Sequence, residues 1–161
     1  MSQVSTRRVG SDDWADWREL RLAALLDSPG AFASTFMSER DLTEQEWRNW
    51  LDPGNGIAVI ASLDGWPVGL AGGYQSGPHV VDLVSMWVSP TARRKGVGDA
   101  LTADIVRWAE EQAASDVRLW VTRGNELAER LYSRHGFVRT GDVRPLPSNP
   151  CVDEIAMRLR R

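Results

Sequence analysis

The chain has 161 residues, a length that predicts one domain, over residues 1–161, with a real hydrophobic core and no room for a second catalytic module. Hydrophobic residues make up 42% of it and charged residues 25%, as in ordinary soluble globular proteins, and the formal net charge of −3 argues against general nucleic-acid binding. The single cysteine allows no intrachain disulfide, and neither a secretion signal nor a run of about twenty apolar residues is present, so we expect a cytoplasmic protein that does not enter the membrane.

The first fifty residues are predicted to form a strand and two helices. Residues 4–9 alternate weakly between polar and apolar side chains, as in a strand. Ser11-Asp12-Asp13 can cap a helix that Ser28-Pro29-Gly30 ends. Thr43 and Glu46 are spaced as a capping box, which predicts that a second helix begins there.

The middle of the chain is predicted to continue with a hairpin, a central strand and a long helix. Asp64-Gly65 separates the apolar runs 57–63 and 67–74, a pattern typical of a β-hairpin. Residues 80–88 form the next apolar run, which we expect to be the central strand. Apolar residues at helical spacing begin at Val97 and predict an amphipathic helix.

The last third is predicted to contain a short helix between strands. Gly136 is the expected left-handed stop of that helix. Three prolines near residue 150 predict a stiff, irregular connection to the final strand, because proline fixes φ and lacks an N–H donor. The expected elements are strands over 117–121, 137–140 and 152–159, a helix over 125–134, and a connection containing Pro145, Pro147 and Pro150.

The stretch Arg93-Arg94-Lys95-Gly96-Val97-Gly98 joins the central strand to the long helix and has the features of an anion site. Its glycines let a ligand approach the backbone, and the free N–H groups of the first helical turn favour phosphate. It lacks the Lys-Ser/Thr pair of GxxxxGK[ST], and Leu101 stands where GxGxxG needs Gly or Ala. A glycine turn between packed elements, with solvated basic side chains, is the plain alternative.

A second motif follows about thirty residues later, Asn125-x-x-Ala128-x-x-Leu131-Tyr132-x-x-x-Gly136-Phe137. Together, in this order, the two motifs resemble the GCN5-related N-acetyltransferase (GNAT) family, most clearly over residues 57–161. The resemblance implies an α/β fold with a mixed, mostly antiparallel twisted sheet, a splayed parallel strand pair and flanking helices. It also implies acetyl-CoA as the cosubstrate.

The resemblance implies that acetyl-CoA lies where the two parallel strands splay apart. Asn125 would contact its pantetheine arm, unless this side chain only caps its helix, and Ala128 would keep the helix face thin enough for the cosubstrate to pass. The pantetheine would pair with the backbone of Met86, Trp87 and Val88, and the pyrophosphate would rest on Arg93, Arg94, Lys95, Gly96, Val97, Gly98 and Asp99.

Two residues are candidates for proton transfer. Tyr132 lies two helical turns after Asn125 on the same face, and a phenol is protonated at neutral pH, so it can donate to a departing thiolate. The resemblance implies this general-acid role and makes Tyr132 one of the residues that contact acetyl-CoA; a half-buried aromatic without a catalytic role is the alternative. Asp82 interrupts an apolar strand, where desolvation would suit a base. A structural hydrogen bond, His79 as a weaker base, and proton transfer through water remain alternatives.

We therefore expect an N-acetyltransferase that passes acetyl directly from acetyl-CoA to a primary amine of a small molecule or peptide. A non-catalytic acyl-CoA-binding sensor or interaction module is the first alternative, and a nucleotide-binding protein is the second. No spacing of His, Cys and Asp predicts a metal site. A homodimer would be in keeping with the family. The acceptor amine stays open.

Overall fold

The computed structural model describes residues 3–52 and 54–161, and its strands form one seven-stranded sheet in the order β1-β2-β3-β4-β5-β7-β6. All neighbouring strands are antiparallel except β4 and β5. The strands are β1 (Val4–Arg8), β2 (Gly56–Leu63), β3 (Trp66–Gly77), β4 (Val80–Val88), β5 (Asp116–Thr122), β6 (Val138–Leu146) and β7 (Asn149–Arg160). The α-helices are α1 (Trp14–Asp27), α2 (Phe36–Arg40), α3 (Glu44–Trp50), α4 (Val97–Glu111) and α5 (Glu126–Arg134).

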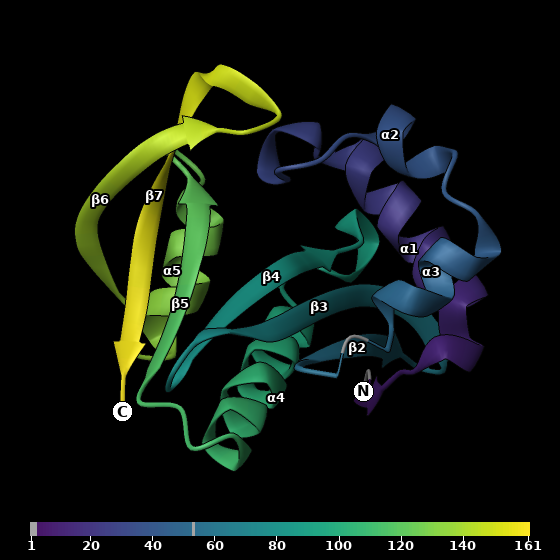
Figure 1. The fold of residues 1–161 in the computed structure, drawn as a ribbon, viewed down its shortest axis with the longest axis horizontal. Coiled ribbons are helices and arrows are strands. Elements are labelled where there is room, and N and C mark those ends of the chain that lie inside the picture. Colours follow the sequence, from purple (N-terminus) through teal and green to yellow (C-terminus); the bar gives the residue numbers. More distant parts are fainter. Residues whose placement is uncertain (1–2, 53) are drawn as a thin grey trace.

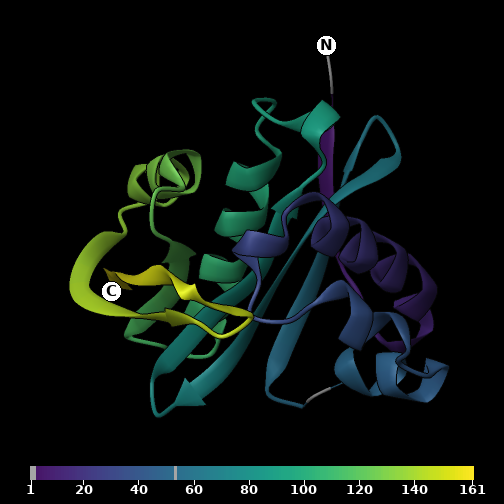
Figure 2. The same cartoon turned by 90° about the horizontal axis from the view of Figure 1, so that it is seen from above.

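Helices cover both faces of the sheet, with α1 to α3 on one side of β2–β4 and α4 on the other (Figures 1 and 2). Side chains of β2 alternate between two separate apolar clusters: Val59 and Ala61 belong to the α4 side, whereas Ala58 and Ile60 belong to the α1 side. Successive side chains of a strand point to opposite faces, so the two clusters lie on opposite faces. The central strands are therefore buried on both sides.

The parallel strands β4 and β5 separate soon after they begin. Their residues pair at only three positions, ending with Asp82 opposite Arg118, and Figure 1 shows the strands diverging beyond that point. A bulge in β4 marks the change, because Ser85 has a φ of +61° and the register with β3 shifts there. The predicted fold class, with its splayed parallel pair, is confirmed.

Several local predictions are also confirmed. The Thr43 hydroxyl accepts a hydrogen bond from the Glu46 amide, and the Glu46 carboxylate accepts one from the Thr43 amide. This pair of bonds is the predicted capping box. Asp64 and Gly65 both have positive φ, as the tight hairpin between β2 and β3 requires. Gly136 ends α5 with a φ of +92°.

The prediction for the proline-containing segment was wrong. Pro145 lies inside β6 and Pro150 inside β7, and the chain turns between Leu146 and Asn149. Pro145 is tolerated because β6 is the edge strand, where a residue can lack an N–H donor without breaking a second ladder, and Pro150 lies in β7 before its pairing with β5 begins at Glu154. The short α2 was not predicted. None of the helices in the described residues is long and apolar enough to cross a membrane.

Candidate functional site

A cleft of about 400 Å³ lies between the end of β4, the loop after it, and helices α4 and α5. Eleven of the thirteen residues predicted to bind the cosubstrate line it; Lys95 and Tyr132 do not. A hollow of about 540 Å³ on the outer surface of α1 shares none of these residues, and no glycine lines it. The predicted residues that line the cleft are Met86, Trp87, Val88, Arg93, Arg94, Gly96, Val97, Gly98, Asp99, Asn125 and Ala128.

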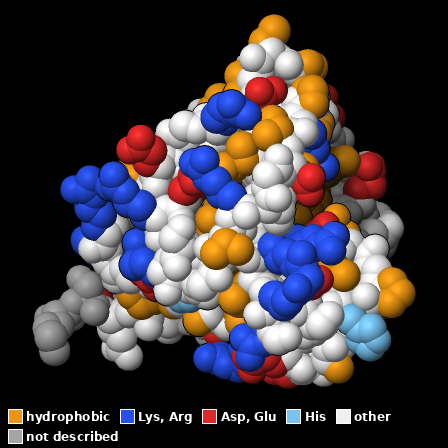
Figure 3. Space-filling view, turned by 90° about the vertical axis from the view of Figure 1, so that its left-hand side faces the viewer, with side chains coloured by type: hydrophobic (Ala, Val, Ile, Leu, Met, Phe, Trp, Pro, Cys, Tyr) orange, Lys and Arg blue, Asp and Glu red, His pale blue; other side chains and the backbone are white. Residues whose placement is uncertain are grey.

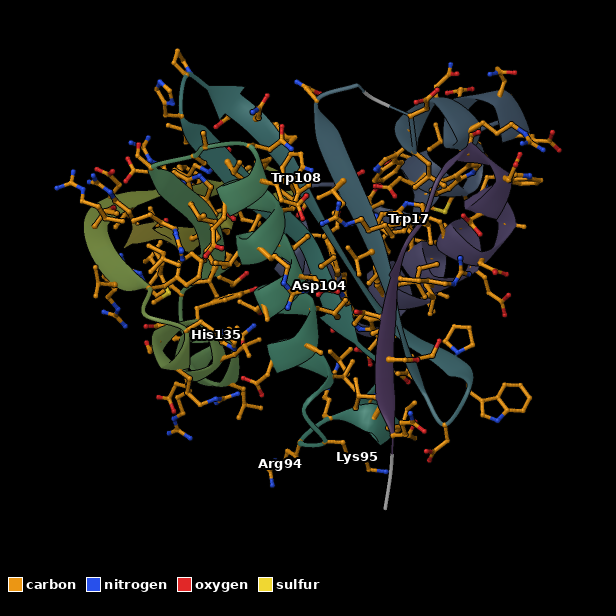
Figure 4. The ribbon with its side chains drawn as sticks, turned by 90° about the horizontal axis from the view of Figure 1, so that it is seen from below. Trp17, Arg94, Lys95, Asp104, Trp108 and His135 are labelled. Atoms are coloured by element: carbon orange, nitrogen blue, oxygen red, sulfur yellow. The ribbon has the colours of Figure 1, made fainter. Side chains whose placement is uncertain are left out.

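The start of α4 forms the end of the cleft that is suited to bind an anion. Gly96 is the N-cap residue with a φ of +85°, so no side chain caps the first turn and its amides stay available as donors. Arg94 is also left-handed, with a φ of +62°. Figure 4 shows Arg94 and Lys95 extending outward from this loop. Backbone donors and positive charge thus meet at one end of the cleft, which suits a phosphate ester.

Gly98 is required by packing rather than by its backbone conformation. A Cβ built on Gly98 would lie 3.1 Å from Cδ2 of Leu131, which belongs to α5. The missing side chain therefore lets α5 approach the first turn of α4 and close the cleft on that side. The sequence motif marked Gly98, but its partner Leu131 could be identified only from the three-dimensional contact.

Asp99 joins the two helices that border the cleft. Its carboxylate accepts hydrogen bonds from Arg134 and lies 2.9 Å from Nε2 of His135 (His135 is labelled in Figure 4). Burial opposes ionisation of Asp99, but the bonds from His135 and Arg134 keep its pKa below the usual range. The negative charge in the first turn of α4 is thereby balanced locally. Arg134 itself lines the cleft and was not predicted from sequence.

Arg93 is not a free cation. Its Nη2 donates to Asp27 at 2.7 Å, and its Nε donates to the Val88 carbonyl at 3.0 Å. Asp27 is the last residue of α1, and it also accepts from the indole N–H of Trp87 at 2.9 Å. The predicted phosphate-binding residue is therefore held against the end of β4, and the free positive charge of the loop belongs to Arg94 and Lys95.

Asn125 combines the two roles that the sequence left open. Its side-chain oxygen accepts from the Ala128 amide at 3.2 Å, so it caps α5. It also lines the cleft, as does Ala128. The cap uses the carbonyl oxygen and leaves the side-chain NH₂ as a donor.

Tyr132 of α5 lies in the apolar core, whereas Asn125, the N-cap residue of that helix, lines the cleft. Its residue surface is 5% exposed, and its ring packs edge-on against Phe137 with centroids 5.8 Å apart. Burial raises the pKa of Tyr132 well above its ordinary value, so its phenol stays protonated throughout the neutral range. The side chain can donate a proton, provided that a reacting atom reaches its hydroxyl.

Asp82 lies outside the cleft lining, at the last position where β4 and β5 pair. Its two oxygens accept from Tyr74 at 3.1 Å and from Ser76 at 2.9 Å, both on β3. These bonds are the structural role that sequence reasoning left open beside the catalytic one. His79, the weaker candidate, lies in the turn before β4, with Nδ1 3.3 Å from the Ala113 carbonyl oxygen.

A buried ion pair connects the N-terminal helices to the bulge of β4. Arg21 of α1 donates to both carboxylate oxygens of Glu39 in α2, and both side chains are 7% exposed. The Arg21 guanidinium also donates to the Ser85 hydroxyl at the bulge and lies over the rings of Phe32 and Trp50. The buried charge of Arg21 between α1, α2 and the bulge of β4 is therefore paired.

The comparison with protein families shows to which family the chain belongs. The family model described as "Acetyltransferase (GNAT) family" matches residues 14–137. The chain belongs to this family. GNAT enzymes use acetyl-CoA as the acetyl donor, and the residues that match the model include the whole cleft and its loop.

A curated relative is a mycothiol acetyltransferase of Paenarthrobacter aurescens (strain TC1), 30% identical over 135 residues. The match covers 81% of this chain but 40% of that protein, so this GNAT chain spans less than half of its relative's length. Two solved structures share the fold. One is a GNAT-family acetyltransferase from Streptococcus pneumoniae (TM-score 0.79, 22% identity, 99% of this chain and 100% of that one). The other is yncA from Salmonella typhimurium, solved with its cofactor acetyl-CoA (TM-score 0.80, 18% identity, 98% and 94%).

Proposed function

We propose that this GNAT chain transfers the acetyl group of acetyl-CoA directly to a primary amine of a small molecule or peptide. The observation that carries the proposal is the meeting of the gap between β4 and β5 with the uncapped first turn of α4. An extended pantetheine arm suits the first feature, and a pyrophosphate suits the second. No metal or covalent enzyme intermediate is needed for this reaction.

The end of β4 supports the placement of the pantetheine. The Ser89 amide donates a hydrogen bond to the carbonyl oxygen of Val68 in β3. Adjacent residues in a strand point their backbone groups in opposite directions, so the backbone of Val88 faces away from β3 and toward the gap. Arg93 already occupies the Val88 carbonyl, which leaves the Val88 amide as the donor for a bound pantetheine carbonyl.

Two groups would handle protons during transfer. Tyr132 would protonate the departing thiolate, since its raised pKa keeps the phenol intact. Either Asp82 or a water molecule would accept the proton that the amine must lose. Much of the rate would come from holding the amine beside the thioester, because binding both reactants converts a bimolecular reaction into one within a single complex.

The relatives support a small-molecule acceptor. The curated matches are named mycothiol acetyltransferases, and the match covers under half of each of the first two. The acceptor of the mycothiol acetyltransferases is one candidate to be tested beside simple amines, amino acids and peptides.

A non-catalytic acyl-CoA sensor is the second candidate. The burial of Tyr132 in the core, outside the cleft lining, favours it, because a proton donor must reach the sulfur. Binding of acetyl-CoA without release of free thiol would be its signature.

A panel of amines with a free-thiol readout tests the proposal. Acetyl-CoA is incubated with the protein and each amine, and transfer is expected to release coenzyme A in proportion to acetylated product. Thermal unfolding is measured in parallel with acetyl-CoA and with ATP. Protection by acetyl-CoA without thiol release from any amine would favour the sensor, and protection by ATP alone would contradict acetyl-CoA binding.

A further inference from the structure

Asp27 is the centre of a hydrogen-bonded cluster at the mouth of the cleft. Its Oδ2 accepts from the Trp87 indole at 2.9 Å, from Arg93 Nη2 at 2.7 Å and from the Ser28 hydroxyl at 2.7 Å. Hydrogen bonds from Trp87, Ser28 and Arg93 keep the pKa of Asp27 below its ordinary value, so the carboxylate is charged at neutral pH. Three elements thus converge on one charged oxygen: the end of α1, the end of β4 and the loop before α4.

The loop that Asp27 holds has an unfavourable backbone. Arg94 has a φ of +62° and Gly96 a φ of +85°. A non-glycine residue in the left-handed region is strained, and such residues persist only where their surroundings hold them. Arg93 immediately precedes Arg94, and its guanidinium is fixed at two points, on Asp27 and on the Val88 carbonyl. The side chain of Arg93 therefore anchors the loop at the residue before the strain.

The same loop supplies the backbone amides at the start of α4. A ligand that binds an ordered loop avoids the entropic cost of ordering it, so an anchored loop binds more tightly than a relaxed one. Asp27 has no place in either sequence motif, and 66 residues separate it from Arg93. Its position makes it a candidate for control of the loop from the α1 side.

We propose that Asp27 is a positioning residue that holds Arg93 and thereby presets the phosphate-binding loop for acetyl-CoA. This inference rests on the proposed function. Asp27 acts through Arg93 and Trp87 and does not itself touch the cosubstrate. Arg93 accordingly contributes geometry more than free charge, because its guanidinium is already paired.

The test is a double-mutant cycle on coenzyme A affinity, measured by titration calorimetry. Asp27→Asn removes the charge but keeps an acceptor of the same shape, and Asp27→Ala removes both. Each Asp27 variant is expected to bind coenzyme A less tightly than the unchanged protein. The affinity of Asp27→Ala, and that of Arg93→Gln, which removes the partner guanidinium, is expected to fall roughly five- to tenfold. The double variant Asp27→Ala/Arg93→Gln is expected to bind no worse than the poorer single variant, because both changes remove the same contact between Asp27 and Arg93.

Asp16→Asn is the matched control, because Asp16 also lies on α1 and pairs with an arginine, Arg7, at an exposed site. Its coenzyme A affinity is expected to equal that of the unchanged protein.

Melting temperatures are recorded for every variant. Lower melting temperatures with unchanged affinity at Asp27 would reduce it to a structural role and overturn the inference, as would losses of affinity that add in the double variant. If Asp27→Ala does not fold, Asp27→Asn and Arg93→Gln decide the outcome. An unchanged protein that binds no coenzyme A would contradict the proposed function instead.

Discussion

Tyr132 shows how far residue-level reasoning reaches. Helical periodicity predicts that it lies on the same side of the helix as Asn125, because that relation depends only on residues close in sequence. Its depth in the core depends on Phe137 and on side chains from other elements, which local spacing does not contain. The pairing of Arg93 with Asp27 was missed for the same reason, since it joins residues 66 positions apart.

Replacing Tyr132 with Phe tests its role as proton donor. We expect kcat to fall about a hundredfold, the lower range for loss of a general acid, with little change in coenzyme A affinity because the ring remains. Steady-state kinetics on the best amine and a coenzyme A titration measure the two effects. Unchanged kcat would remove Tyr132 from the mechanism.

The raised pKa of Tyr132 also predicts how stability changes at alkaline pH. A tyrosine in the unfolded chain ionises near pH 10, whereas the buried phenol holds its proton to higher pH. Above about pH 10 the unfolded chain therefore binds fewer protons, and the free energy of unfolding must fall as pH rises. Urea unfolding at about pH 8 and about pH 10.5 should show this fall, with a smaller one in Tyr132→Phe.

In Tyr132→Phe, part of the fall in the free energy of unfolding should remain, because Tyr74 also contributes to it. Burial and the neighbouring Asp82 raise its pKa as well, and the chain has no third tyrosine. Identical pH dependence in the unchanged protein and in Tyr132→Phe would show that the phenol of Tyr132 is not desolvated.

Elements with local signals were predicted well. The capping box of α3, the Asp64-Gly65 hairpin and the glycine that ends α5 depend on a few adjacent residues. The prolines misled the prediction because their meaning depends on which neighbours β6 and β7 pair with, and no local pattern shows that β6 is an edge strand or that β7 pairs with β5 only from Glu154.

The contact between α4 and α5 gives a prediction at this scale. In Gly98→Val, the new side chain would collide with Leu131, since even a Cβ comes within 3.1 Å of it. We expect a lower melting temperature and weaker coenzyme A binding, because α5 must move away from the cleft. Thermal unfolding and titration calorimetry measure both.

Two further variants make this prediction specific. Gly77→Val is the matched control, because a Cβ there meets no atom within 4 Å, and it should leave coenzyme A binding unchanged. Adding Leu131→Ala to Gly98→Val should restore part of the lost affinity by vacating the space. A Gly98→Val protein that binds as tightly as the unchanged one would show that this contact does not shape the cleft.

At the scale of the whole molecule, the family resemblance predicted the splayed parallel pair that composition and periodicity could not. Strand order depends on which distant segments pair, and the insertion of β7 between β5 and β6 has no local signal. The face of the molecule that includes β6, β7 and α5 carries several groups of basic side chains (Figure 3), although the chain is acidic overall. Arginines of β6 and β7 form ion pairs, namely Arg139 with Glu129, Arg144 with Glu154 and Arg158 with Asp116. The homodimer stays a prediction.

A crystal structure of the protein with coenzyme A bound is the most direct test of the acetyl-CoA site. We predict the pantetheine between β4 and β5, and the pyrophosphate within hydrogen-bond distance of the amides at the start of α4, from Val97 to Asp99. Coenzyme A density outside this cleft, or a pyrophosphate that makes no contact with these amides, would contradict the account.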